Sequence, residues 1–252
     1  MTTTTPTALR PRTPEIKRPI AMRLAATEYQ RVIALLGSLR PEDWRKPTDC
    51  PEWDVRAVAA HVLGMAEMAA SLREQSRQMK AAARRGGVFI DALTAVQVEA
   101  RASLRPEEIV SRLTRISPKA VRGRRLAPRF IRRRTMPEPQ LVDGREEPWT
   151  IGYLLDVILT RDPWMHRIDI TRATGAALVL TAEHDGVLVD DMVTEWAQRH
   201  GHPFALTLTG PAGGSWQVGR GGPQLELEVA DFCRTISGRR RADGLLATQV
   251  PF

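Results

Sequence analysis

The stretch Leu159–Ile170, LTRDPWMHRIDI, decides how the sequence is interpreted. It lies late in a segment with the apolar periodicity of a buried helix, yet it contains Pro163. It also carries Asp162, His166 and Asp169 at helical spacing, so the three side chains share one apolar face. Because burying polar groups is costly unless something satisfies them, these side chains predict a function for that face.

A second predicted helix lies far upstream. Asp54 is a good N-cap for it, and the helix is expected to run to the glycine pair at 86–87. Its buried stripe includes Val58 and Met65, with His61 three residues after the first and four before the second. His61 therefore points inward. A lone inward histidine is more often a hydrogen-bonded core residue than a ligand, so the assignment depends on what faces it.

Two imidazoles and one carboxylate converging from these two helices would form a three-ligand site for a divalent metal. The predicted ligands are His61, Asp162 and His166. For nitrogen and oxygen donors with an open position, zinc is the leading candidate, and nickel, iron or manganese are alternatives. Asp169 is placed to accept a ring N–H from His166 and fix its tautomer. The alternative role for Asp169 is a surface carboxylate paired with a neighbouring arginine.

Pro163 leaves two local structures open. Proline disfavours the helical conformation at the preceding residue and removes one backbone hydrogen bond. In one alternative Asp162 is an N-cap and Pro163 is the first residue of a new helix, which turns the carboxylate away from a metal. In the other alternative a single kinked helix continues through the proline.

Composition limits the classes of protein. The chain has 252 residues, a formal charge of +8, and two cysteines, Cys50 and Cys233, without the paired spacing of a zinc site. The opening sequence MTTTTPTALRPRTPEIKRP has no apolar stretch of signal-peptide type, and no apolar run is long enough to span a membrane. We therefore expect a cytoplasmic protein without a membrane partner. Seven arginines crowd the segment 122–134, but no nucleic-acid-binding motif accompanies them.

The pattern along the chain predicts an α+β protein of two domains. Residues 1–20 are expected to be a disordered tail, and residues 21–175 a mostly helical domain that forms a four-helix bundle. Residues 176–252 contain one amphipathic helix and the alternating runs FALTLTG, SWQVGR and QLELEVA, separated by glycine turns. These predict a small α+β domain with an antiparallel sheet.

Two motifs resemble a known family. WRKPTDCPEWDVRAVAAHV (44–62) and RDPWMHRIDITRATG (161–175) resemble motifs of mycothiol-dependent maleylpyruvate isomerase-like proteins, members of the DinB-like superfamily of four-helix bundles. The resemblance implies a metal triad inside the bundle, with the first ligand at His61 and the last at His166. The middle ligand, usually glutamate, would be Asp162 here. More weakly, ADFCRTISGR (230–239) resembles the sterol-carrier-like domain that often follows these bundles.

The resemblance also implies an activity. A metal lowers the pKa of a bound low-molecular-weight thiol, mycothiol or a similar compound, and makes it a nucleophile. Addition of the thiolate to an activated double bond, followed by its expulsion, would give an isomerase, and its retention would give a thiol S-transferase. Charge makes Arg132, Arg133 and Arg239 candidate contacts for an acidic small substrate, and Trp164 is a candidate pocket wall.

Two functions of other classes stay open. The replacement of glutamate by aspartate beside a proline is also consistent with a non-catalytic binding scaffold whose metal site has drifted. The net charge is consistent with a basic nucleic-acid-associated protein, although the missing motifs make this alternative the weakest.

Overall fold

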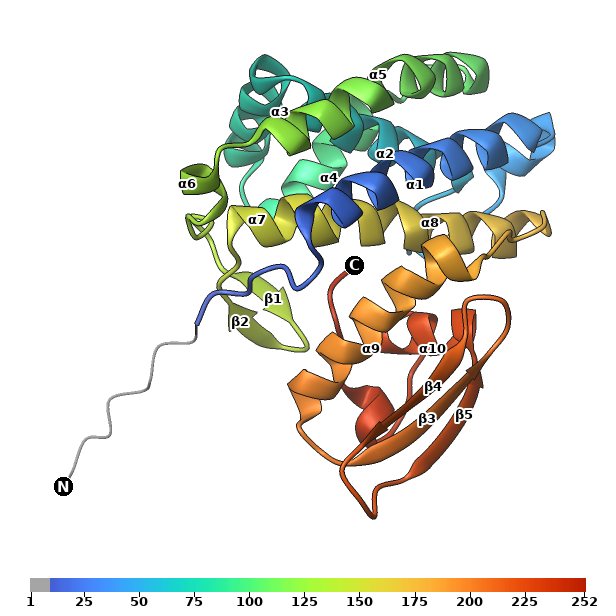
Figure 1. Ribbon diagram of the computed structural model, residues 1–252. Coiled ribbons are helices and arrows are strands. Elements are labelled where there is room, and N and C mark those ends of the chain that lie inside the picture. Colours follow the sequence, from blue (N-terminus) through green and yellow to red (C-terminus); the bar gives the residue numbers. More distant parts are fainter. Residues whose placement is uncertain (1–9) are drawn as a thin grey trace.

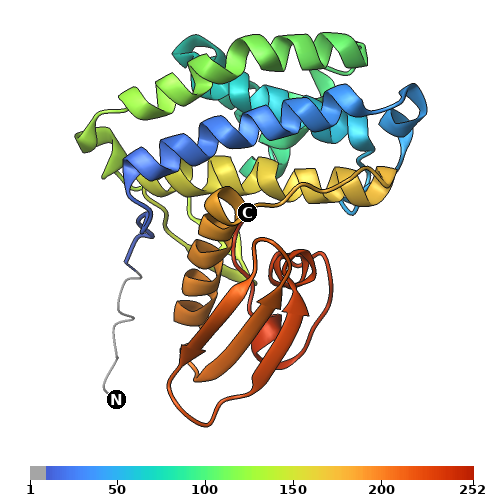
Figure 2. The same cartoon turned by 45° about the vertical axis from the view of Figure 1, so that its right-hand side comes forward.

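The structure, a computed structural model, describes residues 10–252. A layer of long helices forms one part, and a three-stranded sheet with two helices packed on it forms the other, which lies below the helical layer in Figures 1 and 2. The predicted order, a helical part followed by an α+β part, is confirmed. None of the helices in the described range is both long and apolar enough to cross a membrane.

Four helices pack side by side in the helical part (Figure 1). They are α1 (Arg18–Ser38), α2 (Val55–Ala70), α5 (Pro106–Leu126) and α8 (Leu159–Thr174). Their apolar faces share a core of Tyr29, Val32, Leu36, Val58, Val62, Leu113 and Ile170. Gly123 lets α5 approach α2 closely, because a Cβ atom there would lie 2.2 Å from the carbonyl oxygen of Ala69.

The predicted second helix is broken in two, which corrects the sequence-based expectation of one helix up to the glycine pair. Ser71 has an extended backbone (φ −147°, ψ 119°), and its hydroxyl accepts a hydrogen bond from the Glu74 amide. It therefore ends α2 and caps α3 (Leu72–Arg85). The break lets α3 turn back and pack against α4 (Phe89–Glu99), so that α4 reaches α2 beside His61.

The helix through Pro163 is continuous, so Asp162 is not an N-cap. A π-helical turn at Leu154–Ile158 leads directly into α8. Proline leaves the carbonyl of Leu159 without its helical donor. Arg124 of α5 supplies the missing donors: Nη1 donates to the Leu159 oxygen at 3.0 Å, and Nε donates to the Leu155 oxygen at 2.7 Å. The buried guanidinium thus stabilises the irregular turn that aims Asp162 into the bundle.

The remaining elements connect or flank these helices. The segment between α5 and α8 contains a hairpin whose Asp143-Gly144 turn has positive φ angles. These elements are α6 (Arg129–Arg132), β1 (Gln140–Val142), β2 (Arg145–Glu147) and α7 (Ile151–Tyr153). Thr150 caps α7 as predicted, because its hydroxyl accepts from the Tyr153 amide.

The C-terminal sheet is mixed, which corrects the predicted antiparallel sheet. Its strands lie in the order β4-β3-β5, with β3 antiparallel to β4 and parallel to β5. The connection from β4 to β5 passes over the start of β3. It lies so close to the backbone there that a Cβ atom on Gly222 would be 1.8 Å from the Pro203 oxygen. The elements are α9 (Val187–His200), β3 (Phe204–Thr209), β4 (Gly214–Val218), β5 (Gln224–Glu228) and α10 (Val229–Ile236).

The two parts share a hydrophobic core. Trp164, Met165 and Ile168 of α8 pack with the buried residues of α9, β3 and α10. α8 ends at Thr174, where Gly175 adopts a left-handed conformation. The same helix therefore carries His166 on one side and the core of the C-terminal part on another.

Residues 10–20 differ from the expected disordered tail, whereas residues 1–9 lie outside the described residues. Arg12 forms a parallel bridge to Trp149, and its carbonyl accepts from the Thr150 amide at 3.0 Å. α1 already begins at Arg18, with Pro19 in its first turn.

Candidate metal centre

The structure brings the three predicted ligands together. His61 comes from α2, whereas Asp162 and His166 lie one turn apart on α8. Oδ1 of Asp162 lies 3.4 Å from Nε2 of His61 and 3.6 Å from Nε2 of His166. One potential ligand atom from each residue therefore falls within 4.8 Å of the other two.

A chain of buried amides holds the His61 ring. Nε2 of Gln78 lies 3.0 Å from the carbonyl oxygen of Gly64. Because a carbonyl can only accept, the NH₂ group of Gln78 faces Gly64 and its oxygen faces Gln97. Gln97 then donates its amide N–H to Gln78 and presents Oε1 to Nδ1 of His61 at 2.8 Å. The ring proton of His61 is thereby held on Nδ1, which leaves Nε2 facing Asp162.

Asp169 holds the His166 ring in the same way. Its fully buried carboxylate lies 3.0 Å from Nδ1 of His166 and accepts two hydrogen bonds from the Arg239 guanidinium, at 2.7 and 2.8 Å. Burial raises the pKa of Asp169, but the hydrogen bonds from His166 and Arg239 outweigh this effect and bring the pKa to about 2. The carboxylate is thus charged, and Nε2 of His166 also faces Asp162.

This arrangement fits a cation. With the ring protons on the outer nitrogens, both Nε2 atoms and the Asp162 carboxylate direct lone pairs toward one point. Asp162 Oδ2 is buried and has no hydrogen-bond partner among the described residues. Two nitrogens and one oxygen are a donor set suited to a divalent transition metal. Burial raises the pKa of Asp162, but without a metal, positive charge on the His166 and His61 rings outweighs burial and holds the pKa below its ordinary value. A bound cation would supply that positive charge in their place.

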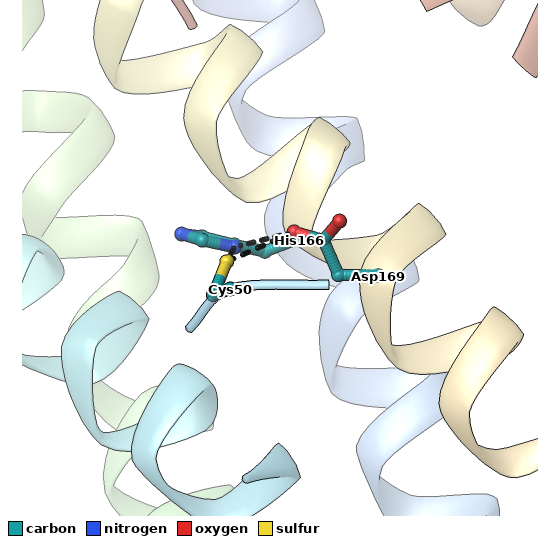
Figure 3. Close-up of side chains that lie close together, drawn as sticks. All are labelled: Cys50, His166 and Asp169. Atoms are coloured by element: carbon teal, nitrogen blue, oxygen red, sulfur yellow. Dashed lines mark hydrogen bonds and ion pairs between the residues drawn. The ribbon is translucent and has the colours of Figure 1, made fainter. Parts of the chain in front are cut away.

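Cys50 lies beside the cluster on the loop before α2, as Figure 3 shows. Its Sγ atom is 3.5 Å from Oδ2 of Asp169 and 3.8 Å from Nδ1 of His166. That nitrogen already faces Asp169, so no free base is available to Cys50. Burial, with a further contribution from the Asp169 charge, raises the pKa of the thiol to about 12. Cys50 is therefore not an activated nucleophile.

An open cleft lies beside Cys50 and Trp53, although none of the three predicted ligands lines it. It has a volume of about 860 Å³ and lies between the loop before α2, the turn between α3 and α4, and the segment after α10. Its walls include Cys50, Trp53, Asp91, Ser237 and Arg239. The Trp53 ring centroid is 5.2 Å from that of His61 and 6.2 Å from that of His166, so it covers both rings. The cleft has room for a small molecule next to the cluster.

Of the four residues predicted to contact the substrate, one lines the cleft and the other three do not. Arg239 lines the cleft. Arg132 forms an ion pair with Asp156, and Arg133 is exposed on the segment after α6. Trp164 is fully buried in the core of the C-terminal part and donates to Asp185. We therefore correct the expectation that Trp164 walls the pocket and that Arg132 and Arg133 adjoin it.

A second buried cluster of potential ligands does not fit a metal. Glu28, His184 and Asp185 lie close together, but all four carboxylate oxygens already accept hydrogen bonds from the protein. Two arginines, Arg31 and Arg167, supply the balancing charge. This cluster is an ion-pair network, in contrast to the unpartnered oxygen of Asp162.

Apart from Asp169, the residues around the site were not identified from the sequence. Gln97, fully buried on α4 like the apolar Ala92 and Leu93, was the strongest available signal, but its partner His61 is 36 positions away. Trp53 was interpreted as packing the loop, and Cys50 as an inert thiol. Their proximity to the histidines follows from the path of the loop before α2, which periodicity does not encode.

Replacing Gln97 by leucine should weaken zinc binding about 10- to 100-fold, because the His61 ring loses the partner that fixes its tautomer and orientation. Titration calorimetry of the metal-free protein with zinc measures the effect. Gln198→Leu, at an exposed glutamine that bonds only Glu15, is the matched control and should bind zinc like the unmodified protein. Equal affinity of both variants would mean that Gln97 does not support the site.

The chain is similar to known proteins in sequence and in fold. Residues 25–171 match the family model described as the mycothiol maleylpyruvate isomerase N-terminal domain. The structure is similar to a crystal structure of the mycothiol-dependent maleylpyruvate isomerase, with a TM-score of 0.57, 14% identity, and coverage of 90% of this chain and 91% of that one. A histidine-to-alanine mutant of that isomerase gives a TM-score of 0.54 at 12% identity, with the same coverage. A search of curated proteins gave no match.

Proposed function

Because the chain belongs to the family of the mycothiol maleylpyruvate isomerase N-terminal domain, we propose that it is a divalent-metal enzyme that uses a low-molecular-weight thiol, mycothiol or a similar compound. It acts as an isomerase or a thiol S-transferase on a small electrophilic substrate. The observation that carries the proposal is the convergence of His61, Asp162 and His166, with a buried oxygen that has no partner in the described residues.

In this proposal the residues of the chain have distinct roles. His61, Asp162 and His166 hold the metal, with zinc as the leading candidate. The metal supplies charge that lowers the pKa of a thiol and so makes it nucleophilic near neutral pH. Gln97 and Asp169 keep the ring protons on the outer nitrogens, so that the inner nitrogens stay free to bind.

The thiol has to come from outside the chain. Cys50 is protonated and its neighbouring imidazole nitrogen is engaged by Asp169, whereas Cys233 is fully buried and burial raises its pKa. The cleft beside Trp53 and Cys50 is the proposed entry for the thiol and its reaction partner. Arg239 is the one predicted arginine at this entry, and it also anchors Asp169.

Cobalt substitution tests the proposal. The protein is stripped with a chelator, loaded with Co²⁺ and titrated with mycothiol while the near-ultraviolet absorption is recorded. A new absorption band of a cobalt–sulfur bond that saturates at one thiol per chain is expected. A cobalt-loaded protein whose spectrum does not change, and which gives no heat with mycothiol in calorimetry, would support the non-catalytic scaffold instead.

A further inference from the structure

The positive charge of the chain is concentrated in one segment. Residues 109–137 contain ten arginines and lysines and no acidic residue, which leaves 27 basic against 29 acidic side chains for the rest of the chain. Two of the ten, Arg124 and Arg132, turn inward to Leu159 and Asp156. The excess charge therefore belongs to the other eight.

These eight side chains are all exposed, and we call them together the basic face. It follows α5, which runs along the outer edge of the helical layer in Figures 1 and 2, and continues past α6. The basic side chains recur every three or four residues along α5, so they lie along one side of it. Among residues 10–252 none of the eight forms an ion pair. The basic face consists of Arg112, Arg115, Lys119, Arg122, Arg125, Arg129, Arg133 and Arg134.

Two large apolar side chains are exposed in the same stretch of sequence as the basic face. Leu126 at the end of α5 is 62% exposed, and Phe130 in α6 is 66% exposed. They lie four residues apart and are flanked by Arg125 and Arg129. Exposed apolar side chains among basic ones suit a surface that meets an apolar phase below a layer of negative charge.

A hollow beside the basic face has the same mixed character. It has a volume of about 450 Å³ and lies between α1 and α5. Met22, Ala26 and Val121 supply apolar walls, and Arg18, Arg23 and Arg125 supply positive charge. The hollow matches a ligand with an anionic group joined to an apolar body.

We propose that the basic face binds the surface of a lipid bilayer rich in anionic lipids. The arginines contact the headgroups while Leu126 and Phe130 enter the boundary between headgroups and acyl chains. A nucleic acid would satisfy the charge alone, and it would leave the two apolar side chains and the apolar walls of the hollow unexplained. The contact is peripheral and leaves the cleft at the metal centre, which α5 does not line, open to small molecules.

Vesicle flotation with the full chain tests this inference. At physiological salt we expect the protein to float with phosphatidylcholine vesicles that contain about 30% phosphatidylserine and to stay in solution with pure phosphatidylcholine. Replacing Arg122, Arg125 and Arg129 by alanine should lower the partition coefficient at least about 10-fold, because each basic residue near an anionic surface contributes about fivefold. The double variant Leu126→Ser, Phe130→Ser should also lower it several-fold at unchanged net charge.

The matched control removes the same charge elsewhere. Arg220, Arg240 and Arg241 are exposed on the C-terminal part, and their triple alanine variant should keep most of the binding. Thermal unfolding of each variant verifies that it is folded. Absence of flotation, or equal losses in both triple variants, would overturn the proposal. The proposal would also be overturned if the protein bound a nucleic-acid duplex or free fatty acid more tightly than vesicles and the Phe130 substitution did not change that binding.

Discussion

A variant in which His166 is replaced by alanine should bind zinc at least about 100-fold more weakly than the unmodified protein. The variant loses one of three protein ligands, which is a larger change than the loss of a hydrogen bond that only orients a ligand. Elemental analysis of protein purified without chelator should find close to one divalent metal per chain, and the variant should lack it. Added zinc should raise the midpoint of thermal unfolding of the unmodified protein only, since a ligand stabilises the state that binds it.

The chain offers a close control for this variant. His202 is an exposed histidine in the loop before β3, and its replacement by alanine should leave the metal content unchanged. The metal-free His166→Ala protein should fold but be less stable than the metal-free parent, because the buried ring and its hydrogen bond to Asp169 are lost. Metal retained by His166→Ala, or lost equally from His202→Ala, would contradict the assignment of the site.

Features governed by local chemistry could be predicted from the sequence. The caps at Asp54 and Thr150 act within three residues, and the left-handed Gly175 ends α8 as glycine commonly does. The inward direction of His61 and His166 follows from a period of 3.6 residues once the helices are recognised. Periodicity alone therefore places both side chains on the inner faces of their helices.

Features governed by long-range packing could not be predicted. Pro163 is compatible with either a new helix or a continuous kinked one. The continuous helix forms because Arg124, 35 residues before Leu159, donates a hydrogen bond to the Leu159 carbonyl that the proline leaves without a donor. The parallel pairing of β5 with β3 depends on a crossing past Pro203 that hairpin signals do not encode. Ser71 shows a third case, in which a capping residue inside a regular periodic pattern ends one helix and starts another.

The largest loss of stability should come from Asp185→Ala. This fully buried carboxylate accepts hydrogen bonds from Arg31 of α1, Arg167 and Trp164 of α8 and the Thr181 amide, and so ties the C-terminal part to the bundle. Removing one partner of a buried ion pair leaves uncompensated charge and unpaired donors. The free energy of unfolding in urea should fall by about 3–5 kcal/mol.

Asp190→Ala is the matched control, because Asp190 also accepts an indole N–H, from Trp216, but at the surface. Water can replace an exposed acceptor, so this variant should lose less than about 1 kcal/mol. The difference between the two changes in the free energy of unfolding then measures the effect of burial, since both variants lose an aspartate. If both lost the same small amount, the Glu28–Arg167–Asp185 network would not hold the two parts together. A large loss confined to Asp185→Ala would mean that the buried network around Asp185 holds α8 against the C-terminal part.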